Sequence, residues 1–167
     1  MSTTIPLEIV VDAERLSSPE ALAELQAKLA DFAPILAKVG EAIEEGLLAN
    51  FNSEGEGSWA ALKDSTRRQK AHDGFPDASE YRSGRLKAAV TQHDAPGHIF
   101  TINENSVTVG ADTAVVRYAG IQNDGSVKHG LPGRILVQVG PGCLAEIVTI
   151  ITDWLGGGDA VRVYVNE

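Results

Sequence analysis

The sequence predicts an α+β fold in which a small, mostly antiparallel β-sheet is packed by a long N-terminal helical region and a C-terminal helix. Three observations predict it. Short stretches of alternating apolar residues lie near both ends of the chain and in its second half. A long apolar stripe at helical spacing occupies the first third. A shorter stripe of the same kind precedes the last glycine-rich turn.

The N-terminal third predicts a strand followed by helix. Apolar residues alternate over residues 5–11, which is the period of a strand. Ser18-Pro19-Glu20 combines a capping hydroxyl, a first-turn proline and an acid near the positive helix end. The helical pattern runs from Pro19 to Phe51, but Pro34 predicts a break or kink after Lys28. Beyond it, apolar residues at steps of four predict one core-facing stripe: Ile35, Val39, Ile43, Leu47 and Phe51.

An extended loop region is expected around residues 52–82, inside a single domain that covers residues 1–167. The loop region opens with the polar, glycine-rich stretch 52–58. The next landmarks recur at spacings of three and four and predict one or two helical turns anchored by a buried tryptophan: Trp59, Leu62, Thr66 and Lys70. Residues 71–80 predict a further loop, because they contain glycine and proline.

The second half of the chain predicts a short helix, strands and a final helix. Ser83 is expected to cap a helix that continues through Leu86 and Val90. Two strands flanking a tight polar connection predict a hairpin, with a third strand following and a last strand closing the chain: residues 98–102, 107–110, 135–139 and 161–165. Residues 115–121 predict a short helix or bend. The stripe over residues 144–155 predicts an amphipathic helix that the glycines 156–158 terminate.

Composition narrows the classes of partner. The formal net charge of -9 disfavours general nucleic-acid binding and suits either plain solubility or a surface that DNA passes without sticking. The single cysteine, Cys143, excludes an intramolecular disulfide and is expected to be a small core or interface residue. The N-terminal residues lack the basic region and apolar run of a signal peptide, so none is expected, and the helix 144–155 is expected to be too short to span a membrane. A cytoplasmic protein is therefore expected.

No catalytic or metal-binding signature is apparent, and no cofactor is predicted. The four histidines, His72, His93, His98 and His129, have no spacing typical of a metal site. Three of them lie in or beside loops that contain glycine or proline, and solvated histidines are expected rather than metal ligands. Phosphate-binding loops and nucleophile elbows are absent from the sequence. The acidic residues mostly fall opposite the apolar stripe, as expected of a solvated helix face.

The basic residues concentrate in one stretch. Arg67, Arg68, Arg82 and Arg85, with Lys70 and Lys87, form this concentration. It can be a local nucleic-acid patch, a basic face that docks on acidic neighbours including other copies of the chain, or an ordinary charged surface. Only Phe75 and Tyr81 are near enough in sequence to stack on bases.

The order of landmarks resembles a known family. The landmarks are the segment that begins at Trp59, the turn Ser83-Gly84-Arg85-Leu86, the stretch Tyr118-Ala-Gly-Ile-Gln-Asn-Asp-Gly125, and Leu131-Pro-Gly-Arg134. In this order they resemble the tail-completion or virion-morphogenesis proteins of Mu-like tailed phages. The resemblance covers about residues 19–155. Gln122 replaces a histidine that the family often has, and Leu-Pro-Gly-Arg-Ile-Leu replaces the more usual I-P-A-R-P-F.

The resemblance implies a structural, non-enzymatic virion protein at the head–tail junction, made in the host cytoplasm. It would form a homo-oligomeric ring, with a hexamer favoured, that completes the tail or joins the tail tube to neck or connector proteins. DNA would pass through the lumen without specific binding. On this view the candidate assembly residues are Arg67, Arg68, Arg82, Arg85 and Arg134, and the structural anchors are Trp59, Leu62, Leu86 and Tyr118.

Two alternatives belong to other classes. A small hydrolase or nuclease would use clustered carboxylates, and a structure should then bring two or more acids together in a pocket. A DNA-binding accessory protein would instead use the basic residues between Arg67 and Lys87, and its binding should be sensitive to salt.

Overall fold

The computed structural model confirms the predicted α+β class and describes residues 5–16, 18–77, 84–156 and 160–165. Among these residues the elements, in chain order, are β1 (Leu7–Val11), η1 (Ala13–Arg15), α1 (Pro19–Ala30), α2 (Ala33–Asn52), α3 (Asp64–His72), α4 (Arg85–Thr91), β2 (His98–Asn103), β3 (Ser106–Ala111), α5 (Ala119–Asp124), η2 (Val127–His129), α6 (Pro141–Leu155) and β4 (Val161–Val165).

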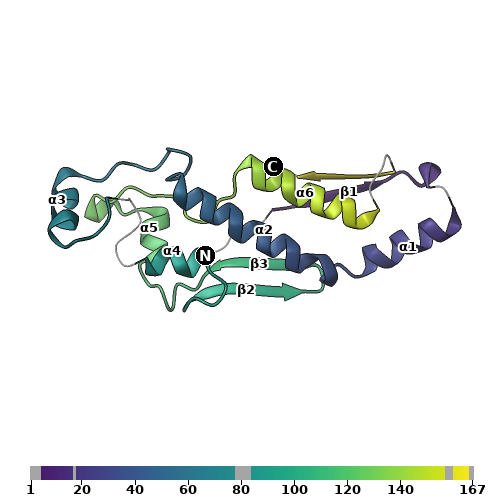
Figure 1. The fold of residues 1–167 in the computed structure, drawn as a ribbon, viewed down its shortest axis with the longest axis horizontal. Helices are drawn as coiled ribbons and strands as arrows, with labels where there is room; N and C mark the ends of the chain where they lie inside the picture. Colours follow the sequence, from purple (N-terminus) through teal and green to yellow (C-terminus); the bar gives the residue numbers. More distant parts are fainter. Residues whose placement is uncertain (1–4, 17, 78–83, 157–159, 166–167) are drawn as a thin grey trace.

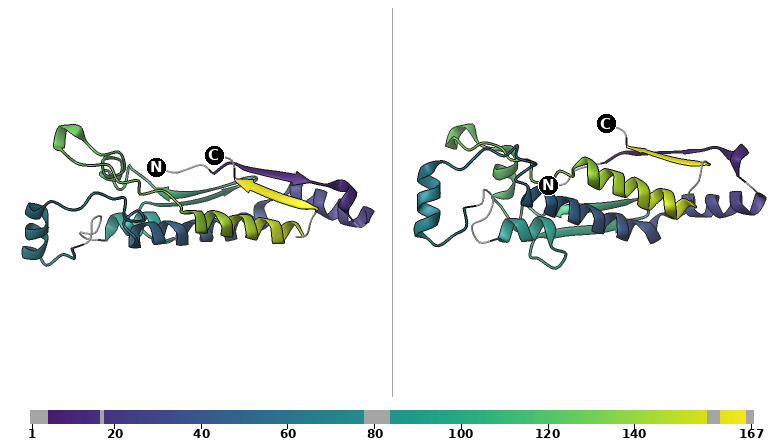
Figure 2. Two further views of the ribbon diagram at one scale, coloured as in Figure 1. Left: turned by 90° about the horizontal axis from the view of Figure 1, so that it is seen from above. Right: turned by 45° about the horizontal axis from the view of Figure 1, so that its top comes forward.

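The molecule is elongated, and α2 runs along its middle (Figure 1). Helix α6 lies along α2 on one side, and α4 with the β2–β3 hairpin lies along it on the other. Helix α1 forms one end of the molecule and α3 the other (Figure 1). The two further views place α2 and α6 in one layer with the strands across their face, while α3 stands apart from both (Figure 2). The long axis therefore separates a packed body from a projecting end.

Helices α1 and α2 begin at the capping and proline residues that were predicted from the sequence. The Ser18 hydroxyl accepts a hydrogen bond from the Ala21 amide, and Pro19 occupies the first turn of α1. Helix α1 ends at Ala30, and α2 begins at Ala33 with Pro34 in its first turn, so the predicted break is confirmed. The apolar stripe of α2 faces the core, with Leu47 fully buried.

The strands form two separate two-stranded antiparallel sheets among the described residues, where one small sheet was expected. The predicted hairpin is confirmed as β2 paired with β3, with His98 opposite Ala111. Strand β1 pairs with β4, with Ile9 opposite Val163, so the two ends of the described chain lie side by side. The β2–β3 sheet packs on α2 and α4, and the β1–β4 sheet packs on α6. Each sheet is thus held by the helices rather than by the other sheet.

The predicted third strand at residues 135–139 is wrong. Ile135 is 57% exposed whereas the consecutive Leu136 and Val137 are buried, so the side chains do not alternate. The side chains of two asparagines make hydrogen bonds to the backbone groups of this segment, in the place of a neighbouring strand. Asn50 donates to the carbonyls of Ile135 and Leu136 at 3.1 and 3.2 Å, and the Leu136 amide donates to Asn123 Oδ1 at 2.9 Å.

Three predicted helix starts are also corrected. Helix α3 begins at Asp64, so Trp59 and Leu62 precede it in a non-helical segment. Gly84, with φ of 75°, is the residue before α4, and Ser83 lies outside the described residues. Helix α6 begins at Pro141 rather than at residue 144, and a proline fits this first turn because its missing amide hydrogen would have no partner there.

The core has two parts that meet on α2. One surrounds Leu47 and includes Trp59, Leu86 and Leu136. The other surrounds Ile147 and includes α1, α6 and the β1–β4 sheet. Ile43 and Val107 pack against both parts, so the interior is continuous. No described helix combines the length and the apolar character that crossing a membrane requires.

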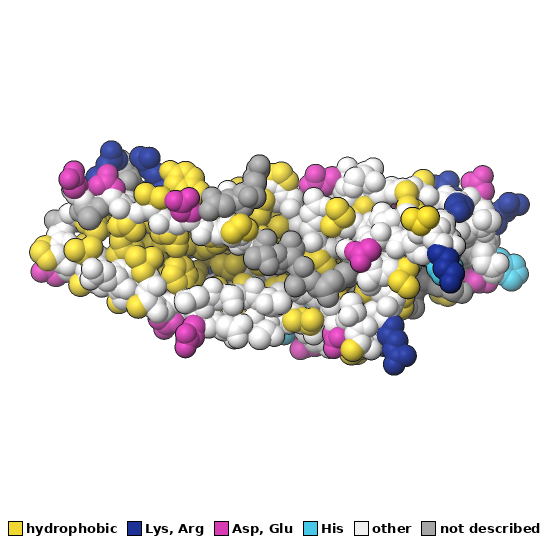
Figure 3. All heavy atoms as spheres, turned by 180° about the vertical axis from the view of Figure 1, so that it is seen from behind, with side chains coloured by type: hydrophobic (Ala, Val, Ile, Leu, Met, Phe, Trp, Pro, Cys, Tyr) yellow, Lys and Arg dark blue, Asp and Glu magenta, His cyan; other side chains and the backbone are white. Residues whose placement is uncertain are grey.

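An apolar groove opens on the face seen from behind (Figure 3). Its volume is about 600 Å³, and apolar residues of β1, β3, α2 and α6 line it, among them Leu7, Val107, Val39 and Ile151. Strands β1 and β3 each have only one strand partner among the described residues. The groove thus has two strands with open backbone edges in its walls and helices as its floor.

Cys143 is predicted to be a slow nucleophile. Burial, with smaller contributions from Glu146 and Glu45, raises the pKa of its thiol from 9.0 to about 11. Its Sγ donates to the Ala42 carbonyl at 3.3 Å. Because the thiolate is the reactive form, and a more basic thiolate offsets part of its lower abundance by being more nucleophilic, we expect modification by an aromatic disulfide reagent at pH 8 to be roughly tenfold slower than that of an unperturbed cysteine. Unfolding in urea should restore the ordinary rate, and a fast reaction in the folded protein would contradict the prediction.

Candidate functional site

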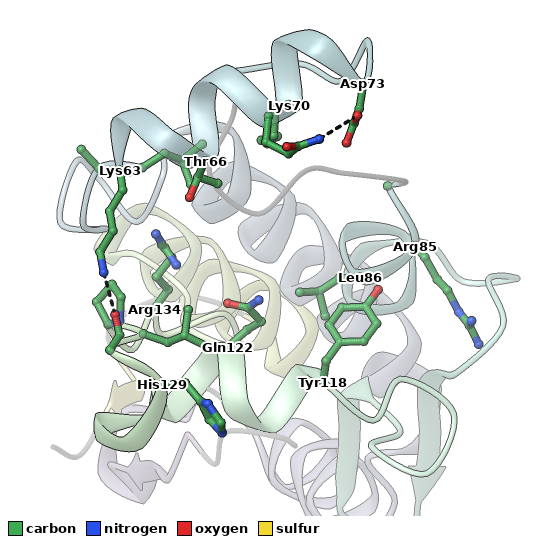
Figure 4. Close-up of a pocket in the computed structure, with 17 residues that line it drawn as sticks. Lys63, Thr66, Lys70, Asp73, Arg85, Leu86, Tyr118, Gln122, His129 and Arg134 are labelled. Carbon is green, nitrogen blue, oxygen red and sulfur yellow. Dashed lines mark hydrogen bonds between the residues drawn. The ribbon is translucent and has the colours of Figure 1, made fainter.

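The motifs that carried the family resemblance meet at the α3 end of the molecule. They surround a hollow of about 670 Å³ whose walls are α3, the start of α4, α5 and the segment 129–134 (Figure 4). Lys63 and Thr66 point into it from one side, with Tyr118 and Gln122 facing them from the other (Figure 4). Segments that are 50 or more positions apart in the sequence therefore form one site.

Two glycines allow the backbone to fold tightly beside this hollow. The α5–η2 excursion returns through an isolated bridge between Ser126 and Leu131. A Cβ on Gly133 would lie 2.9 Å from the Asp124 carbonyl oxygen, and Gly125 takes a φ of 78°. The Arg134 amide then donates to the Gln122 carbonyl at 2.9 Å. The Tyr118–Gly125 and Leu131–Arg134 motifs thus form one structural unit.

Arg134 connects this unit to the segment that contains Trp59. Arg134 is 6% exposed, and one NH2 group of its guanidinium donates a hydrogen bond to the Ala60 carbonyl at 2.9 Å. A buried guanidinium needs such acceptors, because burying its charge without them is costly. The structure therefore gives Arg134 a contact inside the chain, and its predicted part in a subunit interface stays a prediction.

Three other candidate assembly residues, Arg67, Arg68 and Arg85, lie on the surface. Arg67 Nε lies 3.5 Å from Asp77 Oδ1, and Arg68 Nε donates to the Asp64 carbonyl at 3.4 Å. Arg85 is exposed and donates to the Val115 carbonyl at 3.2 Å. Lys and Arg side chains gather at the α3 end of the rear view (Figure 3). Arg82 lies outside the described residues.

The four proposed anchors divide into two pairs. Trp59 is buried and packs edge-on against Phe51, with ring centroids 5.4 Å apart, and Leu86 is 3% exposed in the same core. Leu62 is half-buried and lines the hollow. Tyr118 is 42% exposed at the same site, so it contributes surface to the hollow more than support to the core.

Exposed apolar side chains accompany the arginines at this end. Val115, Tyr118 and Ile121 are more than a third exposed, as are Leu131 and Ile135, and Val127 at the tip of the excursion is fully exposed. Large apolar side chains gathered on one projecting end are typical of surfaces that a partner covers. Arginine and tyrosine beside them match the residue types that are enriched at protein interfaces.

A second hollow gathers acidic residues, as the hydrolase alternative required. Glu45, Glu56 and Glu146 line a space of about 680 Å³ beside Cys143. All three are exposed, and they do not form a group of three ligating side chains within 4.8 Å among the described residues. They therefore lack the burial that usually accompanies an acid–base pair in an enzyme.

One group of ligating side chains was missed from the sequence. Glu44, His93 and His98 bring one ligand atom each within 4.8 Å of one another. The expectation of a solvated loop residue is wrong for His98, whose side chain is 1% exposed in β2. The spacing search missed the group because Glu44 is 49 positions before His93, and only the packing of α2 on the hairpin joins them.

In comparisons with known proteins, no family model, curated protein or solved structure matches the chain.

Proposed function

We propose that the chain is a structural protein of a tailed-phage virion, which assembles as a ring at the head–tail junction and completes the tail or joins it to the neck. The observation that carries this proposal is the ordered set of motifs that resembles the tail-completion family. These motifs meet at the α3 end, where a projecting helix and the α5–η2 excursion surround a hollow bordered by exposed apolar side chains and arginines. Such a projection has more surface than core, which is typical of a segment that a neighbouring subunit covers.

Two further features support a structural protein that assembles with its neighbours rather than an enzyme. The apolar groove has open strand edges in its walls, and an extended segment of a neighbour can pair with such edges. The net charge of -9 suits a ring whose lumen DNA must traverse without being held. A basic α3 end on an otherwise acidic chain also suits head-to-tail contact between copies, which closes into a ring when the rotation permits.

The proposal predicts that Arg85→Glu leaves the monomer folded and impairs assembly. Arg85 is exposed and makes one backbone hydrogen bond, so its replacement should change the free energy of unfolding by less than about 1 kcal/mol. Reversing a charge inside the interface should weaken assembly by about tenfold or more. Light scattering over a concentration series measures the mass in solution, and mass spectrometry of purified particles of the phage encoding the chain measures incorporation.

Lys38→Glu is the matched control. Lys38 is exposed on α2, toward the end formed by α1, and its substitution makes the same charge change. A folded Arg85→Glu variant that assembles as well as Lys38→Glu would place the interface elsewhere. A protein that stays monomeric and is absent from the particles would refute the ring itself.

A further inference from the structure

Glu44, His93 and His98 converge at the corner where the β2–β3 hairpin meets α2. Glu44 is on α2, His93 follows α4, and His98 is the first residue of β2. Phe100, two positions after His98 on the same strand face, lies against α2 at Gly40, where a Cβ would overlap its ring. Because Gly40 and Glu44 are one helical turn apart, this contact sets the distance between Glu44 and the hairpin.

The hydrogen bond on one ring nitrogen of His98 fixes the state of the other. Nδ1 lies 3.1 Å from the Ala89 carbonyl oxygen, which can only accept, so Nδ1 carries the hydrogen. Nε2 then has a free lone pair in the neutral ring, and this is the tautomer in which histidine binds metals. In metal-binding histidines, the ring nitrogen that does not bind the metal commonly donates its hydrogen to a backbone carbonyl, which fixes the orientation of the ring.

Nε2 of His98 faces a carboxylate in a nearly closed space. It lies 2.7 Å from Glu44 Oε1, and the side chains are 1% and 14% exposed. Despite this distance, Nε2 is buried without a hydrogen bond of acceptable geometry. A short distance alone does not make a hydrogen bond, because hydrogen bonds weaken steeply when donor and acceptor are misaligned. Two electron-rich atoms so close need a positive centre between or beside them, either a proton or a metal ion.

His93 distinguishes these two possibilities. Its Nδ1 lies 3.3 Å from the same Glu44 Oε1, and its ring packs edge-on against Phe100 with centroids 4.5 Å apart. With a proton between His98 and Glu44, His93 would be a hydrogen-bond donor to the same carboxylate, whereas with a metal ion it would be a third ligand. The His93 side chain is 58% exposed, so a fourth ligand can enter from solvent.

We propose that Glu44, His93 and His98 bind a divalent transition-metal ion of the zinc type. Two imidazoles and one carboxylate are a donor set that zinc accepts, with bonds of about 2.0–2.2 Å. Tetrahedral geometry places such donor atoms roughly 3.3 Å apart. The His98–Glu44 separation is 2.7 Å, the His93–Glu44 separation is 3.3 Å, and all three ligand atoms lie within 4.8 Å of one another. Rotations of the three side chains would have to bring these atoms to the tetrahedral spacing. The ion would fix the α4–β2 connection on α2 and leave one position open to water or to a donor from another molecule.

The test is a titration with Zn²⁺ of the purified protein, freed of any tag and treated with a chelator. Isothermal titration calorimetry measures the binding. We expect one ion per chain and a rise in the thermal midpoint. His93→Ala should weaken binding by about tenfold or more, because it removes a ligand from an exposed position without opening the core. Glu44→Gln should do the same while keeping the side-chain shape. Co²⁺ absorption then reports whether the geometry is tetrahedral.

His72→Ala and His129→Ala are the matched controls, since both histidines are exposed and lie outside the group. They should bind Zn²⁺ as tightly as the parent protein. Far-UV circular dichroism of each variant shows that it is folded before titration. Absence of one-to-one binding in the parent protein would overturn the proposal and leave a proton between Glu44 and His98. Equal losses in the control variants, or none in His93→Ala and Glu44→Gln, would overturn it as well.

Discussion

Replacing Trp59 by alanine is expected to lower the free energy of unfolding by about 3–5 kcal/mol, the usual cost of emptying a buried tryptophan site. The indole is 8% exposed and packs edge-on against Phe51, with ring centroids 5.4 Å apart. Gly55 lies so close to the indole that a Cβ there would overlap it, so the polar loop wraps around this ring. The free energy of unfolding of a typical domain is only about 5–15 kcal/mol, so this loss would be a large share of the stability of the protein.

Urea unfolding followed by circular dichroism and by fluorescence of the remaining tryptophan measures this effect. Trp154→Ala is the matched control, because Trp154 is only half-buried and lies in the other part of the core. The centroids of its ring and the Phe32 ring are 5.2 Å apart. We expect a loss of about 1–2 kcal/mol there, since less surface leaves water on folding. Equal losses for the two substitutions would mean that Trp59 does not anchor the loop region on the core.

The segments that could be predicted from the sequence are those whose signal is local. The Ser18 cap, the break before Pro34 and the α2 stripe each depend on residues within a few positions of one another. The β2–β3 hairpin is of the same kind, because a tight connection brings its strands together directly. The pairing of β1 with β4 was not predicted, since it joins the two ends of the chain and depends on how both pack on the helices.

The candidate sites could be predicted only in part for the same reason. Trp59 and Leu86 are large apolar residues in patterned surroundings, so their burial could be expected. Arg134 looked like a surface cation, because nothing local indicates that the Ala60 carbonyl would meet it 74 positions away. Glu44 and His98 are likewise distant in sequence, and the contact between Phe100 and Gly40 that aligns them is visible only after the hairpin has packed.

The erroneous strand at residues 135–139 shows how a period of two can mislead. Any extended segment can carry alternating apolar residues, but a strand also needs a partner for its backbone groups. Here the Asn50 amide, on α2, takes the place of that partner for the carbonyls of Ile135 and Leu136. Asn50 is 7% exposed within an otherwise apolar helix face, and this burial is explained by the two bonds it donates.

Asn50→Ala is therefore expected to lower the free energy of unfolding by about 2–3 kcal/mol, because two carbonyl groups lose their donor in a largely buried place. Asn50→Asp should cost at least as much, since the carboxylate keeps the shape but would face the carbonyls with acceptors only. Asn52→Ala, two positions later on the exposed surface, removes a hydrogen bond from Lys87 and should cost less than about 0.5 kcal/mol. Urea unfolding compares the three variants. If Asn50→Asp were as stable as the parent protein, the hydrogen bonds would not be what holds the segment 135–136 on α2, and packing of Leu136 alone would have to explain its conformation.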